Sequence, residues 1–126
     1  MNYMLTARIC LLVVIAATLN SVMGISGHVV DPQYPLHAQF HFSREIALNL
    51  GAIMVAGLAM FSAARYRNRL TWSLMAAALL FLTGGFWAGL LITSASIPNF
   101  GAGANHAANT LFAVLSLAFA WKPFNQ

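Results

Sequence analysis

The stretch DPQYPLHAQFHFSREIALN, residues 31–49, decides how the rest of the chain is interpreted. It holds both carboxylates of the protein, two of its four histidines and two of its four prolines, and it separates one apolar run from the next. Prolines interrupt regular helix, and ionisable side chains are costly inside a bilayer. The stretch therefore predicts a connection at a membrane surface, where a second helix begins.

The composition outside this stretch is that of an integral membrane protein. The chain of 126 residues is 60% hydrophobic and 6% charged, whereas about 25% of the residues of a soluble domain are charged. A bilayer-spanning helix needs about 20 residues, so the length allows four spans and leaves no room for a soluble domain. The net charge of +4 is not gathered into a stripe that would follow phosphates, which argues against nucleic acid as a partner.

The apolar runs predict an all-α fold in which residues 1–126 form one transmembrane domain, a four-helix bundle. The predicted spans are residues 9–23, 42–64, 70–93 and 104–121. The first span, with Arg8 before it and small residues near Gly24, also fits a cleavable signal peptide. An uncleaved helix and a signal peptide both stay open.

The connections follow from glycine and proline. These residues predict a non-helical loop from residue 27 to residue 35, with His28 inside it, and a second helix from about Pro35 to about Tyr66. Such a helix would be about 48 Å long, against about 30 Å of hydrocarbon, so its first turns should project from the bilayer. A glycine-rich link is expected over residues 94–103. Small residues on the second helix should let another helix approach closely: Ala52, Ala56, Ala59 and Ala63.

The basic residues predict the orientation of the bundle. Three arginines occupy the short connection 65–69, and Arg8 and Lys122 fall on the same side after an even number of crossings. Cytoplasmic loops carry an excess of Lys and Arg, so residues 65–69 and both termini are predicted to be cytoplasmic. All the histidines then lie toward the outer face.

Polar residues on two helices form the candidate site. Those of the second helix recur at intervals of four residues and share one face: His37, His41, Glu45 and Asn49. The fourth span opens at the same depth with two more, His106 and Asn109, and Asn105 lies beside them. The second and fourth spans run parallel, so the two sets can face each other if the helices meet.

Several chemistries fit this set. Imidazoles one helical turn apart chelate zinc or copper, so His37 and His41 with Glu45 or His106 would form a metal site. A haem needs opposed ligands, which His106 with His37 or His41 would supply. Glu45 and His41 are suited to proton transfer on a lipid-like substrate, and a quinone or lipid pocket is a further option. The remaining interpretation is that these are interfacial side chains at headgroup level without a ligand.

The run from Pro35 to His41, PLHAQFH, resembles the Pro-x-His-Ala-x-Phe-His signature of a family of small four-helix membrane proteins of unknown function. The chain departs from that pattern at Tyr34, where tryptophan is expected, and at Gln39, where a basic residue is usual. The resemblance implies that His37 and His41 matter and does not indicate an activity.

These features predict a small multi-pass membrane protein that acts as a binding or accessory subunit of a membrane assembly. Its partners would be the lipid bilayer and other membrane subunits, and its outer face would hold a metal, haem, quinone or lipid. The alternative is a membrane-embedded enzyme that uses Glu45 and His41 for proton transfer. His41 followed by Glu45 one turn later is also similar to a pair in sterol isomerases and sterol-binding membrane proteins.

Overall fold

The computed structural model describes residues 2–93, 97 and 100–126. Within these residues the chain forms four α-helices and one 3-10 helix, and no strand: α1 (Tyr3–Val29), α2 (Leu36–Phe61), η1 (Ala64–Tyr66), α3 (Arg69–Thr93) and α4 (Phe100–Phe124). Each of the four α-helices is long and apolar enough to cross a membrane. The predicted all-α membrane bundle is therefore confirmed.

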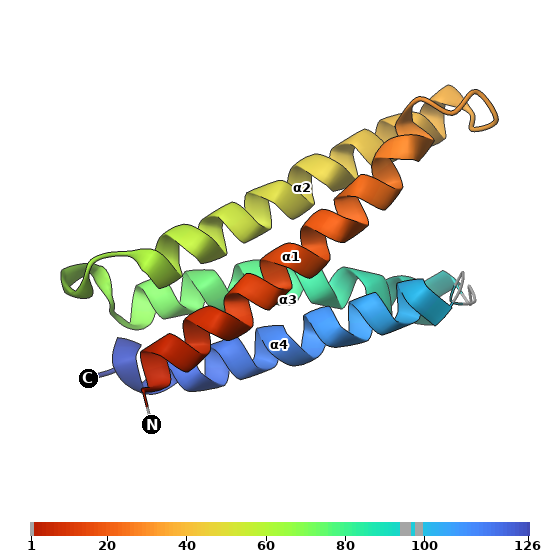
Figure 1. Ribbon diagram of the computed structural model, residues 1–126. Coiled ribbons are helices and arrows are strands. Elements are labelled where there is room, and N and C mark those ends of the chain that lie inside the picture. Colours follow the sequence, from red (N-terminus) through yellow and green to blue (C-terminus); the bar gives the residue numbers. More distant parts are fainter. Residues whose placement is uncertain (1, 94–96, 98–99) are drawn as a thin grey trace.

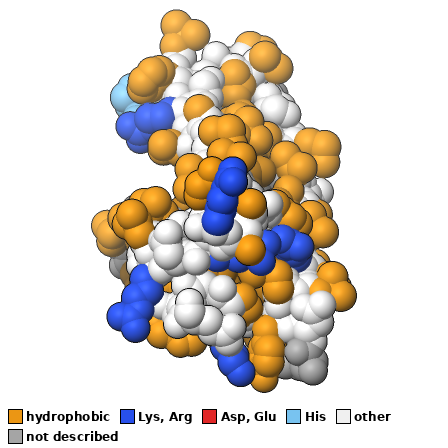
Figure 2. Space-filling model, turned by 90° about the vertical axis from the view of Figure 1, so that its left-hand side faces the viewer, with side chains coloured by type: hydrophobic (Ala, Val, Ile, Leu, Met, Phe, Trp, Pro, Cys, Tyr) orange, Lys and Arg blue, Asp and Glu red, His pale blue; other side chains and the backbone are white. Residues whose placement is uncertain are grey.

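The helices run alternately up and down and form a ring. Helix α1 packs against α2 and α4, and α3 packs against the same two helices, so α2 and α4 lie on a diagonal of the bundle. Both termini and η1 lie at one end of the molecule (Figure 1), which we call the basic end. It carries Arg8, Arg65, Arg67, Arg69 and Lys122. Figure 2 shows basic side chains spread among apolar ones on this face.

The opposite end, which we call the histidine end, is more open. Helices α1 and α2 stay together there and diverge from α3 and α4, as Figure 1 shows. Among the described residues, none of residues 19–52 or 84–108 is buried. We call these two segments the histidine half of the bundle, and residues 3–18, 53–83 and 109–124 the basic half.

The core lies entirely in the basic half, where small side chains let the helices approach closely. Its members are Ala7, Cys10, Leu11, Val14, Thr18, Ile53, Ala56, Ala59, Met60, Met75, Leu79, Thr83, Asn109, Ala113, Ser116, Ala120 and Phe124. Two of the four predicted small residues of α2, Ala56 and Ala59, belong to it. Of the other two, Ala52 is half-buried, and Ala63 lies beyond the end of α2 and is exposed.

Helix α4 is tied to both of its neighbours by side-chain hydrogen bonds. The Ser116 hydroxyl donates to the Ala7 carbonyl of α1 at 3.1 Å. The Trp72 and Trp87 indoles of α3 donate to the Leu117 carbonyl at 3.2 Å and to the Thr110 hydroxyl at 2.8 Å. Among the described residues, no hydrogen bond joins α2 to another α-helix. Apolar packing therefore holds α2 in the bundle, together with the Arg8 guanidinium over the Phe61 ring and the His28 ring beside Phe42.

The predicted loop of residues 27–35 is wrong at its start, because α1 continues through Gly24 and Gly27 to Val29. His28 is therefore in the last helical turn rather than in a loop. A helix satisfies its own backbone groups, which favours continuing it in an apolar environment. The helix ends only at Val30 and Asp31, where Pro32 disfavours helical geometry in the residue before it.

The predicted end of the second helix near Tyr66 is also wrong. Helix α2 ends at Phe61, and the backbone N–H and hydroxyl of Ser62 both donate to the Ala59 carbonyl, at 3.4 and 2.8 Å. Ser62 and Ala63 then take extended backbone, which lets η1 turn the chain toward α3. Helix α4 begins at Phe100, so the predicted link over residues 94–103 is shorter, and residues 94–96 and 98–99 lie outside the described part of the chain.

Candidate functional site

A cavity of about 760 Å³ occupies the place where the two helix pairs diverge. Side chains from all four helices line it. The α1 and α4 lining is polar: Thr18, Ser21, His106 and Asn109. The α2 and α3 lining mixes polar and apolar groups: His41, Arg44, Glu45, Leu48, Asn49, Ala52, Ala78, Phe81, Leu82, Gly85 and Phe86.

The structure brings together five of the six predicted site residues. His41, Glu45 and Asn49 line the cavity from α2, and His106 and Asn109 line it from α4. The two helices are diagonal neighbours, so the two sets contribute to one cavity without α2 packing on α4. The cavity, rather than a helix-to-helix contact, relates the two sets.

His37, the sixth predicted residue, is not part of the lining. Its Nε2 lies 2.9 Å from Nε2 of His41, so one imidazole donates a hydrogen bond to the other. The two rings meet edge to face, with centroids 4.4 Å apart. His37 is exposed, and it positions the His41 ring at the entrance of the cavity.

This pair does not amount to a metal centre in the part of the chain that the structure describes. There, no group of three or more His, Cys, Asp or Glu side chains lies close enough to hold a metal ion. Protein zinc sites use three or four ligands, and the two imidazoles supply two. Metal or haem binding by His37, His41, Glu45 and His106 stays a prediction.

His106 is fixed on the α4 side of the cavity. Its imidazole stacks on the Phe86 ring of α3, with centroids 3.7 Å apart and planes 11° from parallel. Its carbonyl accepts the hydroxyl of Thr110 at 2.9 Å, and the same hydroxyl accepts the Trp87 indole N–H. These contacts present His106 to the cavity as a flat aromatic group with polar edges.

The polar wall contributed by α1 was not predicted. The Asn105 amide donates to the Ser21 hydroxyl at 2.8 Å and to the Ala17 carbonyl at 3.2 Å. The Asn109 amide donates to the Thr18 hydroxyl at 3.1 Å. Thr18 and Ser21 are among the few polar residues of an otherwise apolar span and lie one helical turn apart, a signal that could have identified them.

The mouth of the cavity lies between α2 and α3. Every exposed residue of the lining comes from these two helices, and the two buried ones, Thr18 and Asn109, come from α1 and α4. Leu48 and Phe81, which are 65% and 81% exposed, lie midway along α2 and α3. The middle of a membrane-spanning helix faces hydrocarbon. The mouth therefore opens sideways toward lipid, and α1 and α4 form the back wall.

Glu45 and Arg44 stand at the same mouth, nearer the histidine end. The Glu45 carboxylate makes no hydrogen bond or ion pair with any residue that the structure describes, although Arg44 is its neighbour in sequence. Both side chains are exposed. A carboxylate in this position is available to a ligand or to water.

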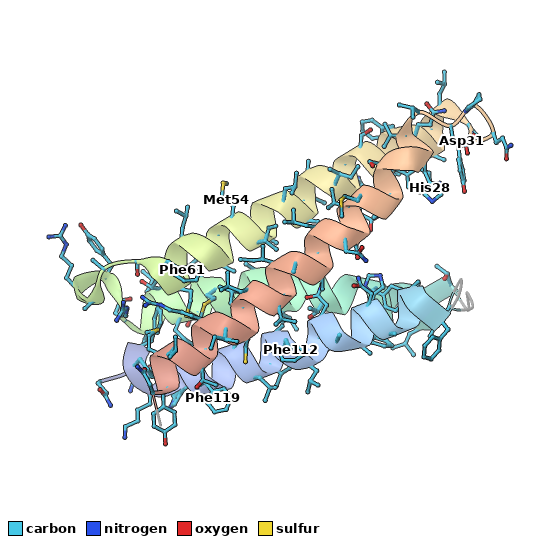
Figure 3. The ribbon with its side chains drawn as sticks, viewed as in Figure 1. His28, Asp31, Met54, Phe61, Phe112 and Phe119 are labelled. Atoms are coloured by element: carbon cyan, nitrogen blue, oxygen red, sulfur yellow. The ribbon has the colours of Figure 1, made fainter. Side chains whose placement is uncertain are left out.

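The tip of the histidine end has a structural role. The rings of His28, Tyr34 and Phe42 pack together with centroids 4.9 to 5.3 Å apart. The Gln39 amide donates to the carbonyls of Asp31 and Tyr34, both at 3.0 Å, and so fastens the loop onto α2. Figure 3 shows His28 and Asp31 together at this tip, at the junction of α1 and α2. Neither lines the cavity.

No protein-family model, curated protein or solved structure matches this chain. The resemblance of residues 35–41 to a signature of small membrane proteins therefore stays a prediction. Within that run, Gln39 closes the loop, and His41 reaches the cavity.

Proposed function

We propose that this membrane protein binds an apolar molecule with a polar group, of the lipid or quinone type, in the cavity where its two helix pairs diverge. The observation that carries the proposal is the cavity of about 760 Å³, because it collects polar side chains from three of the four helices behind a mouth that Leu48 and Phe81 border. Ligand sites in proteins are typically concave, mostly apolar and of about 300 to 1,000 Å³, with a few convergent polar groups. The cavity has these properties.

The position of the mouth supports a ligand that arrives from the bilayer. Leu48 and Phe81 border it at the depth of the hydrocarbon, where a water-soluble ligand would be at low concentration. An apolar molecule diffusing in the membrane meets this opening directly. Its polar group can then reach the Asn109 amide and the His106 imidazole of the α4 wall.

The experiment uses two matched glycines of α3. Gly85 lines the cavity and Gly89 does not, and at each position an added Cβ would meet nothing within 4 Å. Gly85→Phe should close the mouth, whereas Gly89→Phe should leave it open. Wild type and both variants would be purified in the same nanodiscs, and their bound lipids would be identified by native mass spectrometry. A specific lipid retained by wild type and Gly89→Phe and lost from Gly85→Phe supports the proposal, and equal retention by all three contradicts it.

We further propose that the protein works as a binding or accessory subunit of a larger membrane assembly, with the histidine end at the outer face and the basic end in the cytoplasm. The clustering of Arg8, Arg65, Arg67, Arg69 and Lys122 at one end supports this orientation. After mild solubilisation, the native protein should migrate with a complex larger than its own 13.6 kDa chain. Migration as a free monomer would argue for a protein that acts alone.

Proton transfer on a lipid-like substrate is the second candidate, because Glu45 and His41 line the same cavity. In this case the Glu45 carboxylate would accept or return a proton, and His41, held by His37, would act as its counterpart. Glu45→Gln keeps the size of the side chain and removes its basicity. The variant should bind the lipid as wild type does and fail to convert it, whereas a pure binding protein would convert nothing in either form.

A further inference from the structure

Asn109 is one of the two buried polar residues that line the cavity, and its side chain is only half satisfied. It is 4% exposed, and its Nδ2 donates to the hydroxyl of Thr18, which is 1% exposed. Its Oδ1 is buried and accepts no hydrogen bond from any residue that the structure describes. The cavity wall therefore includes a residue whose buried acceptor has free capacity.

A buried acceptor without a partner favours ligands that can donate a hydrogen bond to it. Leaving a buried polar atom unpaired costs about 1 to 3 kcal/mol, so a ligand that donates a hydrogen bond there gains what an acceptor-only ligand does not. A carbonyl, ether or ester oxygen can only accept. A hydroxyl can donate, and an uncharged donor avoids the larger cost of burying an ion.

The rest of the cavity limits the ligand further. On the α3 side the cavity is lined by Phe81, Leu82 and Phe86. These side chains favour an apolar body, and His106 stacked on Phe86 continues the flat apolar surface. The charged groups of the cavity, Arg44 and Glu45, stand at the exposed mouth, away from the buried wall.

We propose that the cavity accepts an apolar molecule carrying a hydroxyl group, which enters between α2 and α3 with its hydroxyl leading and donates a hydrogen bond to Oδ1 of Asn109. This inference rests on the proposed function and narrows it to hydroxyl-bearing ligands. A long-chain alcohol is the simplest molecule of this class that a bilayer dissolves. An oxidised quinone, which only accepts hydrogen bonds, would bind less well than its reduced, hydroxyl-bearing form.

The test compares two competitors that differ in one hydrogen-bond donor. The full-length protein in phosphatidylcholine nanodiscs is photolabelled with a long-chain alcohol that carries a diazirine in its alkyl chain. Hexadecanol and its methyl ether then compete for labelling of cavity peptides. Hexadecanol should compete about tenfold better, the factor expected for one hydrogen bond to a buried acceptor.

Two variants assign this preference to Asn109. Asn109→Leu removes the acceptor at similar volume and should abolish the advantage of hexadecanol. Thr18→Val removes the partner of the Asn109 amide and leaves the acceptor, so the advantage should persist. If Asn109→Leu does not fold, equal competition by hexadecanol and its methyl ether on the wild-type protein would still overturn the inference.

The possible outcomes separate this inference from the proposed function. Equal competition by hexadecanol and its methyl ether, with labelling lost in Gly85→Phe, would keep the apolar ligand site and overturn the role of Asn109, whose oxygen would then be satisfied by water. A preference that persists in Asn109→Leu would also overturn it. Labelling that is absent from cavity peptides, or equal in wild type and Gly85→Phe, would overturn the ligand site itself and this inference with it.

Discussion

The two halves of this bundle are built from the same four helices, but the helices pack tightly in one half and diverge in the other. In the basic half, alanines, serine and threonine bring the helices into contact, and every buried residue of the described chain lies there. In the histidine half, the helix pairs separate and leave a cavity of about 760 Å³. The difference indicates that one half supplies the stability of the fold and that the other half is free to hold a ligand.

The helices also differ in how they are held. Helix α4 carries hydrogen bonds to α1 and α3 along much of its length, from Asn105 to Leu117. Helix α2 carries four of the predicted site residues, three of which line the cavity, and in the described chain no hydrogen bond joins it to another α-helix. A wall held by hydrogen bonds, facing a helix without them, would suit the proposed exchange of a ligand.

The largest expected effect is a difference in maleimide labelling between the two ends of the bundle, which tests which end faces outward. In a Cys10→Ala background, Gln33→Cys places a thiol at the tip of the histidine end, and Tyr66→Cys places one in η1. An impermeant maleimide applied to intact cells should label Gln33→Cys and label Tyr66→Cys only after permeabilisation, because the arginine-rich connection favours the cytoplasm. The reverse pattern would place the cavity nearer the cytoplasmic side.

The second prediction makes the same substitution one helical turn apart on α2. Ala56 is fully buried in the basic half, whereas Ala52 lines the cavity. Ala56→Phe should destabilise the fold by about 1 to 3 kcal/mol because the packed half has no room for the ring. Ala52→Phe should cost much less, because the cavity can accept it. Unfolding in mixed micelles measures both, and equal losses would contradict the division into a packed half and an open half.

The third prediction tests the buried hydrogen bond that joins α4 to α1 in the basic half. Ser116→Ala removes the buried hydrogen bond to the Ala7 carbonyl. Interhelical hydrogen bonds in membranes contribute about 0.6 kcal/mol on average and at most about 1.7 kcal/mol. We expect a loss within that range in the same unfolding assay. Ser73→Ala, at an exposed position of α3, is the control and should have no measurable effect.

The smallest effect is expected at the mouth. Phe81 is 81% exposed, so Phe81→Ala should change the free energy of unfolding by less than about 0.5 kcal/mol. The same variant should accelerate exchange of the bound photoreactive alcohol, because it widens the entrance. A stability loss comparable with that of Ala56→Phe would mean that Phe81 packs in a core and does not border an opening.

Much of the architecture was predictable because it depends on composition along the chain. Apolar runs of sufficient length must become helices in a bilayer, where each segment satisfies its own backbone groups. The helix ends were less predictable. Gly24 and Gly27, which would favour the end of a helix in water, are helical in α1. Helix α2 ends at Phe61, five residues before the predicted end at Tyr66.

The candidate site was partly predictable because helix periodicity alone decides which residues of one helix share a face. Intervals of four residues place His41, Glu45 and Asn49 on one face of α2 whatever the neighbouring helices do. His37 pairs with His41 one helical turn away. That His37 lies outside the cavity while His41 lines it depends on the rotation of α2 in the bundle. That Thr18 and Ser21 would complete the wall depends on α1 packing closely against α4.

The sequence by itself determined the number of spans, the gathering of the basic residues at one end and the periodic face of α2, because these follow from local composition and helix geometry. Only the tertiary structure decided that the bundle packs in one half and opens in the other, and that Asn109, a residue of the cavity wall, has a buried oxygen with no hydrogen-bond partner among the described residues. Those features depend on the crossing of helices that are far apart in the chain. Side-chain contacts between such helices set the crossing, and the pattern within a single helix does not encode it.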